Sequence, residues 1–104
     1  MSKRRSGRMA LTAAIGLSGE DRQKCSFTLP ARATNLNRHG AAVQLHRDLS
    51  IGSVVSLRNK RGTQVSARIV SQIRVLEGKR TYGVEFLEQD DKALNFWGIS
   101  FPIT

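Results

Sequence analysis

The sequence predicts an all-β protein: a six-stranded antiparallel β-barrel with a short C-terminal helix and a flexible basic arm at its N-terminus. Three features predict this class. Apolar and polar residues alternate in successive short runs, clusters of turn-forming residues separate the runs, and no long stretch has helical periodicity. Closing such strands into a barrel removes exposed sheet edges. With 104 residues, we expect the arm at 1–8 and a single barrel domain at 9–104.

The alternating runs locate the strands. They predict strands over residues 9–17, 27–33, 41–45, 54–58, 65–75 and 82–86. Pro30 interrupts the second run, which indicates an edge position or a bulge because proline cannot donate to a ladder. In the fifth run the apolar residues Val65, Ala67, Ile69, Ile73 and Val75 are expected on one face, toward the core.

Turn signals lie between these runs, and one short helix is expected after the last of them. The turns are predicted at 18–24, 35–40, 48–52, 59–62 and 77–80. Residues 90–98 begin with two Asp and end at Gly98, as a short helix does. Its apolar face, Ala93, Phe96 and Trp97, is expected to plug the barrel mouth, although Trp97 could instead stack on a ligand. A short extended piece is expected at 99–101.

The charge balance points to a polyanionic partner. The chain has 17 Lys and Arg against 8 Asp and Glu, a net charge of +9, which suits nucleic acid, nucleotide phosphates or an anionic membrane surface. The low aromatic content, 6%, argues against a stacking platform for nucleic acid. Cys25 is the only cysteine, so we expect no disulfide, no metal site and a reducing compartment, the cytoplasm. The apolar run at 9–17 is too short to cross a bilayer, so no transmembrane segment is expected.

The N-terminal segment carries the first candidate ligand residues. Residues 1–8, MSKRRSGR, have four cations and no acid. Arg4 and Arg8 are spaced so that two planar guanidinium groups sit on a short tether. Each guanidinium matches phosphate oxygens or a guanine edge with paired N–H donors. Basic termini are more often solvated tails, and the spacing alone does not choose between the two interpretations.

The second candidate motif is the polar turn from Asn35 to Gly40. Asn and Gly tolerate left-handed backbone angles, and Asn side chains bond nearby backbone groups, so a tight turn has a clear mechanism here. The segment either simply joins two strands or presents the amides of Asn35 and Asn37 and a bare backbone to a ligand. The order of the residues leaves both interpretations open.

The two motifs in this order resemble the PilZ domain, whose signature is RxxxR followed by [D/N]xSxxG. Residues 49–52, LSIG, resemble the family's LxxG entry to a strand, and residues 83–86, GVEF, resemble its penultimate-strand segment. The resemblance extends from Arg4 to about Phe101. It implies a split-barrel type of fold that binds the bacterial second messenger cyclic di-GMP, with no further cofactor.

The resemblance also assigns roles to single residues. Arg4 and Arg8 would bind guanine edges and phosphates, Asn35 takes the Asp/Asn position, and Gly40 lets the backbone approach the ligand. Asn37 stands where the family usually has Ser. An amide can donate and accept as a hydroxyl does, but it is larger, so the affinity stays open.

We therefore expect a small stand-alone receptor or adaptor rather than an enzyme, since no nucleophile motif or phosphate loop is present. Ordering of the Arg arm would be the switch, and an unidentified protein partner would receive the signal. Two alternatives remain. One is a basic barrel that binds RNA or DNA, a less favoured partner, through Arg58, Lys60, Arg61, Arg68 and Arg74. The other is a nucleotide-free PilZ-like adaptor between proteins.

Overall fold

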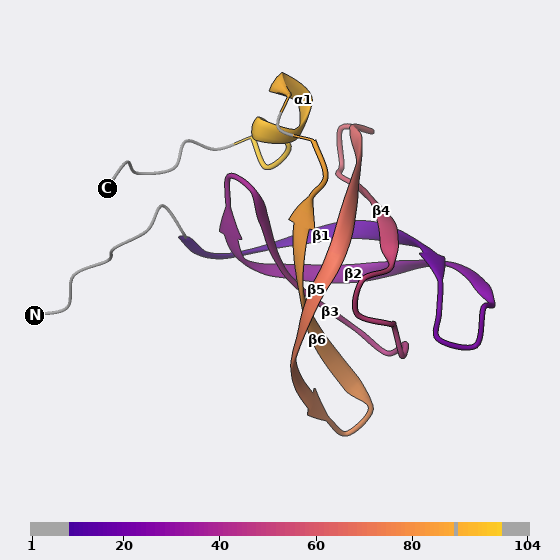
Figure 1. The fold of residues 1–104 in the computed structure, drawn as a ribbon. Helices are drawn as coiled ribbons and strands as arrows, with labels where there is room; N and C mark the ends of the chain where they lie inside the picture. The colour runs from indigo at the N-terminus through magenta and orange to yellow at the C-terminus, as the bar shows by residue number, and fades with distance from the viewer. Residues whose placement is uncertain (1–8, 89, 99–104) are drawn as a thin grey trace, which may run out of the picture.

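A computed structural model describes residues 9–88 and 90–98 and shows a closed antiparallel β-barrel (Figure 1). The elements are β1 (Met9–Glu20), β2 (Ser26–Asn37), β3 (Gly40–Leu45), β4 (Val54–Arg58), β5 (Gln64–Leu76), β6 (Lys79–Phe86) and α1 (Asp91–Leu94). Around the barrel the strands follow the order β1-β2-β3-β6-β5-β4. The pairing of β1 with β4, Leu17 opposite Leu57, closes the circle. The predicted fold class is confirmed.

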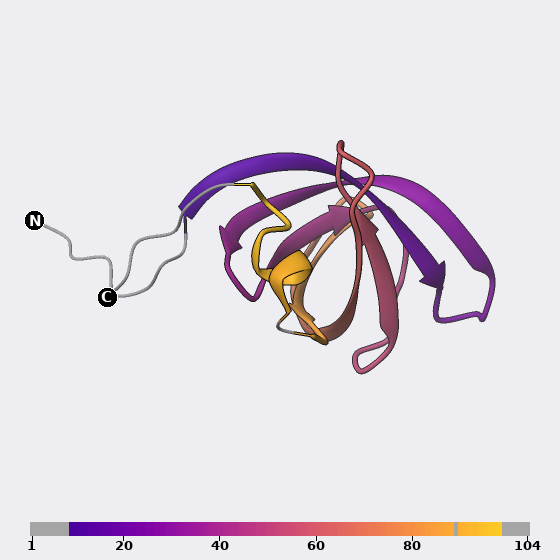
Figure 2. The ribbon, with the colours of Figure 1, turned by 90° about the horizontal axis from the view of Figure 1, so that it is seen from above.

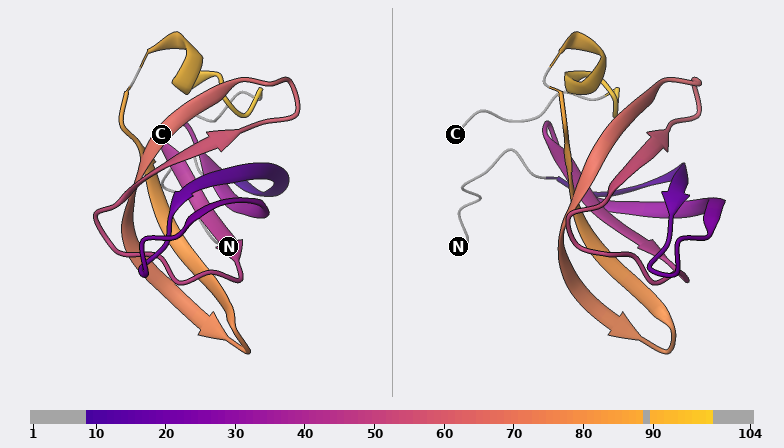
Figure 3. Two further views of the ribbon diagram at one scale, coloured as in Figure 1. Left: turned by 90° about the vertical axis from the view of Figure 1, so that its right-hand side faces the viewer. Right: turned by 45° about the vertical axis from the view of Figure 1, so that its right-hand side comes forward.

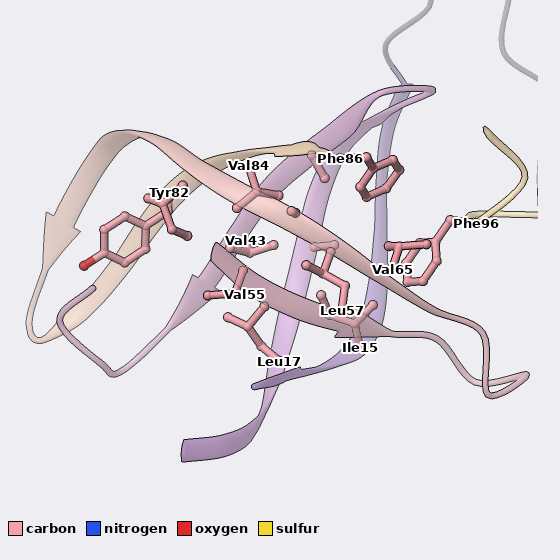
Figure 4. Packing of buried hydrophobic residues seen from close by; sticks show 14 of the residues in the cluster. Ile15, Leu17, Val43, Val55, Leu57, Val65, Tyr82, Val84, Phe86 and Phe96 are labelled. Atoms are coloured by element: carbon pink, nitrogen blue, oxygen red, sulfur yellow. The ribbon is translucent and has the colours of Figure 1, made fainter. Parts of the chain in front are cut away.

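Alternating side chains build the core, as the sequence pattern predicts. Residues such as Leu17, Leu57 and Ile69 are fully buried, and their chain neighbours are exposed or partly exposed. In β3 both faces are buried, since Ala42 beside Val43 is only 5% exposed. Figure 4 shows this core as a column of side chains, with Tyr82 at one end and Phe86 and Phe96 at the other. Since burying an aliphatic side chain contributes roughly 1.5–3 kcal/mol, this column is the main source of stability.

The end of the barrel near Phe96 is closed by α1, which lies over the opening in Figure 2. Asp90 caps the helix, and its carboxylate accepts a hydrogen bond from the Ala93 N–H at 2.9 Å. Ala93 and Phe96 are buried in the core, and Trp97 packs against it. The Phe96 ring stands edge-on to Trp97, with 4.9 Å between centroids. The predicted plug is confirmed.

Polar contacts close the opposite end. The Tyr82 hydroxyl accepts a hydrogen bond from the Leu49 N–H at 2.8 Å inside the barrel. Nearby, Asp21 accepts hydrogen bonds from the backbone N–H of Gln23 and Cys25 and pairs with Arg47 at 3.0 Å. The Cys25 hydrogen bond, followed by that from Arg47, lowers the pKa of Asp21 below 3.8, although desolvation opposes the shift.

The strand β5 departs from the prediction. Ile73 and Val75 do not join the core, because 59% and 46% of their surfaces are exposed. The register with β6 shifts twice, between Ile69 and Ser71 and between Gln72 and Arg74. The first extra residue turns the following side chains to the other face, and the second restores the original face. Val75, opposite Arg80, is therefore on the same face as Tyr82 and is exposed because this part of the strand extends beyond the core. Beyond Ile69 the strand leaves the barrel and forms, with β6, a hairpin that projects from the end opposite α1 (Figure 3).

Other boundaries differ by a few residues. β1 continues to Glu20 and β2 to Asn37, so the two turns beside them are shorter than expected. Pro30 pairs with Gly16 of β1 and precedes the β2–β3 ladder, which begins at Arg32, so its edge position is confirmed. The predicted arm at 1–8 and extended piece at 99–101 lie outside the described residues. No helix of the described chain is long and apolar enough to span a membrane.

Candidate functional site

The site predicted from the sequence is the β2–β3 connection, residues 35–40. Asn35 adopts a left-handed backbone with φ 49°, as expected, where the β2–β3 register shifts between Thr34 and Asn37. Leu36 then turns into the core with 3% exposure. The Asn35 side chain is exposed, and within the described part of the chain nothing is hydrogen-bonded to it. Its amide is therefore free to bind a ligand.

Asn37 has a structural role in the same connection. Its Oδ1 accepts a hydrogen bond from the His39 N–H at 2.8 Å, and its backbone pairs with Gly40 across the turn. This is the way in which an Asn side chain replaces a backbone group in a tight turn. A Ser hydroxyl can accept the same hydrogen bond, so the residue that the family usually has would serve here as well.

The connection is fastened to the barrel by groups distant in the sequence. The Trp97 indole Nε1–H donates to the Asn37 carbonyl at 3.0 Å and to the Gly40 carbonyl at 3.3 Å. The Phe86 N–H donates to the His39 carbonyl at 2.8 Å. Trp97 is half-buried and packed against the core, so the structural interpretation of this residue is supported. The segment that closes the barrel and the candidate site are thus connected through the hydrogen bonds of Trp97.

Gly40 is required by packing. A Cβ at this position would collide with the Val84 carbonyl oxygen and would lie 3.1 Å from the Glu85 Cα. Both belong to β6, which pairs with β3 through Gly40 and Glu85. Only a residue without a side chain lets the two strands approach this closely. Its other expected role, to let the protein backbone approach a ligand, stays a prediction.

The β1–β2 register places the beginning of β1 beside the β2–β3 connection. Met9, the residue that follows Arg8, pairs with Leu36, which lies between Asn35 and Asn37. The basic segment therefore joins the barrel directly beside the connection. Arg4 and Arg8 themselves lie outside the described residues. The structure thus places the root of the arginine motif at the site.

A groove of about 700 Å³ crosses the outer face of β1, β2 and β3. It begins at Thr12, which pairs with Thr34 next to Asn35, and its size is that of a small-molecule site. Its walls carry Arg32, His46 and Lys79 and no acid. Our sequence analysis did not single out these residues. Arg32 belongs to the polar half of a strand that was used only to find the core, whereas His46 follows a predicted strand and Lys79 was assigned to a turn.

The sequence model of the PilZ domain matches residues 2–95. The chain belongs to the PilZ domain family. No curated protein and no solved structure matches it. The closed six-stranded barrel with one short helix agrees with the PilZ fold. PilZ domains are binding or adaptor domains of cyclic di-GMP signalling and are not enzymes. Membership therefore supports a binding or adaptor role at the level of the family.

Two further observations describe the chemistry of this PilZ barrel. Among the described residues, no group of three His, Cys, Asp or Glu side chains could hold a metal ion.

Arg61, one of the basic residues considered for nucleic acid, donates from its guanidinium to the Asn95 and Phe96 carbonyls, each at 3.1 Å. It therefore serves to cap the turn after α1.

Proposed function

We propose that this PilZ domain binds cyclic di-GMP at the β2–β3 connection, with Arg4 and Arg8 closing over the ligand. The observation that supports this most directly is the pairing of Met9 with Leu36, which joins the basic segment to the barrel beside Asn35. The exposed Asn35 amide and the cationic groove next to it complete a site for a ligand with two phosphates and guanine edges.

The proposed mechanism combines a rigid wall with an arm that orders on binding. The connection is held by Trp97 and Phe86, so it is pre-organised and loses little entropy when the ligand binds. Arginine forks would supply charge-assisted hydrogen bonds, each contributing on the order of 1.5–3 kcal/mol, to offset ordering of residues 2–8. The ordered segment then forms a new surface for a protein partner in the cytoplasm.

Isothermal titration of cyclic di-GMP, with GTP as the control ligand, tests this proposal. We expect Arg4→Ala and Arg8→Ala each to weaken binding by about tenfold or more, the loss of one charged hydrogen bond. The melting temperature of the ligand-free domain should stay unchanged. Arg58→Ala is the matched control, because it removes the same charge from β4, which pairs with β1 and β5 but not with β2 or β3, the strands that the candidate connection joins. Equal affinities for all three variants would refute the proposed site.

The asparagines can be tested separately. Asn35→Gly removes the amide but keeps a residue suited to φ 49°, so binding should weaken without loss of stability. Asn37→Ser should be tolerated in both respects, because the hydroxyl can accept the His39 N–H. A large loss of affinity in Asn37→Ser would show that the amide contacts the ligand itself.

Polynucleotide binding is the competing outcome of the same titrations. Binding of RNA or DNA through many phosphates falls steeply with salt, whereas binding of a compact dinucleotide falls less. The position of Arg61 counts against an extended phosphate-binding surface, because its guanidinium is already engaged. Salt-sensitive binding of RNA, with no heat from cyclic di-GMP, would overturn the proposal.

A further inference from the structure

The hairpin formed by the outer halves of β5 and β6 carries a second candidate surface. We propose that the free edge of β5, Val70–Leu76, docks an extended segment of a partner protein in which apolar residues alternate with Asp or Glu. The partner segment would add as a further strand. This site lies at the end of the barrel opposite α1 and does not depend on the ligand proposed above (Figures 1 and 3).

The backbone of this segment has one free side. The pairing of β4 with β5 ends at Val54 and Arg68. The last backbone contacts on that side join Ile69 to Gly52 and Ser53, at 2.7 and 2.9 Å. From Val70 to Leu76 the strand pairs only with β6, and no other strand of residues 9–88 and 90–98 lies along it. Such an edge is a template for strand addition.

The side chains of this edge are apolar and exposed. Val70, Ile73, Val75 and Leu76 are exposed by 42%, 59%, 46% and 56% of their surfaces. Two of them are already neighbours, since the Val70 and Ile73 side chains both lie within 4 Å of the position that a Gly83 Cβ would take. Natural edge strands are usually guarded by charges, proline or bulges. This edge carries two register shifts and one charge, Arg74, and its remaining polar residues are Ser71 and Gln72, so the apolar stretch that a partner strand would meet is Ile73, Val75 and Leu76.

Charge indicates the chemistry of the partner. Arg74, Lys79 and Arg80 surround the apolar residues, with Glu77 as the only acid of the hairpin. Lys79 also lines the groove described above and Arg80 lies 3.9 Å from Asp48, so Arg74 is the cation that this surface shares with neither. A second copy of this chain would bring the same cations and a net charge of +9, so self-pairing is disfavoured. Glu77 occupies the tip of the hairpin. An anionic lipid surface would meet this carboxylate first and be repelled by it, so a membrane is also disfavoured as the partner. An extended peptide with acidic and apolar residues would form hydrogen bonds with the free backbone groups of the β5 edge and would carry the charge opposite to that of its cations.

Short synthetic peptides test this inference without cyclic di-GMP. One peptide alternates Val and Ile with Glu, and its control has Lys in place of every Glu. With the isotope-labelled domain, we expect the Glu peptide to shift the amide resonances of residues 70–76 and to protect them from hydrogen exchange. It should bind at least roughly tenfold more tightly than the Lys peptide, because complementary charges favour it.

Two variants locate the contact. Val75→Lys should abolish binding of the Glu peptide, whereas Leu87→Lys, which changes an apolar residue of similar exposure, 42%, outside the hairpin, should not alter it. Equal affinity for both peptides, resonance shifts outside the hairpin, or equal losses in both variants would overturn the inference. A dimer of the domain that dissociates in Val75→Lys would show that the edge binds a second copy of the chain, and this would also overturn the inference. Co-sedimentation with anionic vesicles that is lost in Val75→Lys would do the same, because the edge would then bind a membrane.

Discussion

Replacing Gly40 with Ala should destabilise the ligand-free barrel, although the residue belongs to the ligand signature of the family. The added Cβ would collide with the Val84 carbonyl oxygen, so β3 must move away from β6. Overpacking of this kind costs about 1–3 kcal/mol, and each ladder hydrogen bond lost beside Glu85 adds about 1 kcal/mol. We expect a total loss of about 2–4 kcal/mol, from a stability that is typically about 5–15 kcal/mol.

Thermal unfolding of the ligand-free protein measures this effect. A loss of about 2–4 kcal/mol corresponds to a fall in melting temperature of roughly 10–25 °C for a domain of this size. Gly16→Ala is the matched control, because a Cβ there meets only the Arg58 Cβ, at 3.9 Å. Its melting temperature should be unchanged or slightly higher, since Ala restricts the unfolded chain. If the two variants melt at the same temperature, the packing argument for Gly40 is wrong.

Three further substitutions test other contacts. Trp97→Phe removes the indole N–H that fastens the β2–β3 connection, and thermal unfolding should show a loss of about 1–2 kcal/mol together with weaker ligand binding. Tyr82→Phe leaves the buried N–H of Leu49 without a partner and should cost about 1–3 kcal/mol in the same assay, without changing the affinity. Because the pKa of Asp21 is lowered, its stabilising effect is present above pH 3.8 and is lost as the pH falls through the lower folded value. Asp21→Asn should therefore reduce stability at neutral pH and flatten the acid limb of a stability–pH curve, and an unchanged limb would contradict this.

Much of the fold could be predicted because the barrel follows local rules. Alternation located all six strands, since each has one face in the core. The Asp signal located the beginning of α1, where Asp90 caps the helix, but the helix ends at Leu94 and residues 95–97 form a turn before Gly98, which adopts a left-handed backbone. The exposure of Ile73 and Val75 could not be predicted in the same way. Their alternation follows that of the buried residues, and their exposure depends on the pairing with β6, which shifts register twice and carries this part of β5 beyond the core as a hairpin.

The site was predictable only in part, for a related reason. The turn chemistry of Asn35 and Asn37 is local and can be inferred from the residue types. The contact of Trp97 with this turn joins residues 60 positions apart, and no short-range pattern carries that information. The groove beside Asn35 is also formed by residues of β1, β2, β3 and β6 together, so Arg32 and Lys79 become neighbours of one cavity only after the barrel closes.

These contacts suggest which parts of the signature report on ligand binding. Gly40 and Asn37 are both held by the fold, one by its approach to β6 and the other by its turn hydrogen bond, so a PilZ barrel needs them with or without a nucleotide. The Asn35 side chain is exposed and makes no hydrogen bond in the described structure, so the fold requires there only a residue that tolerates φ 49°, as Asn and Gly do. Substitution at Asn35 should therefore report on ligand binding alone, whereas substitution at Gly40 changes the packing of β3 against β6 whether or not a ligand is bound.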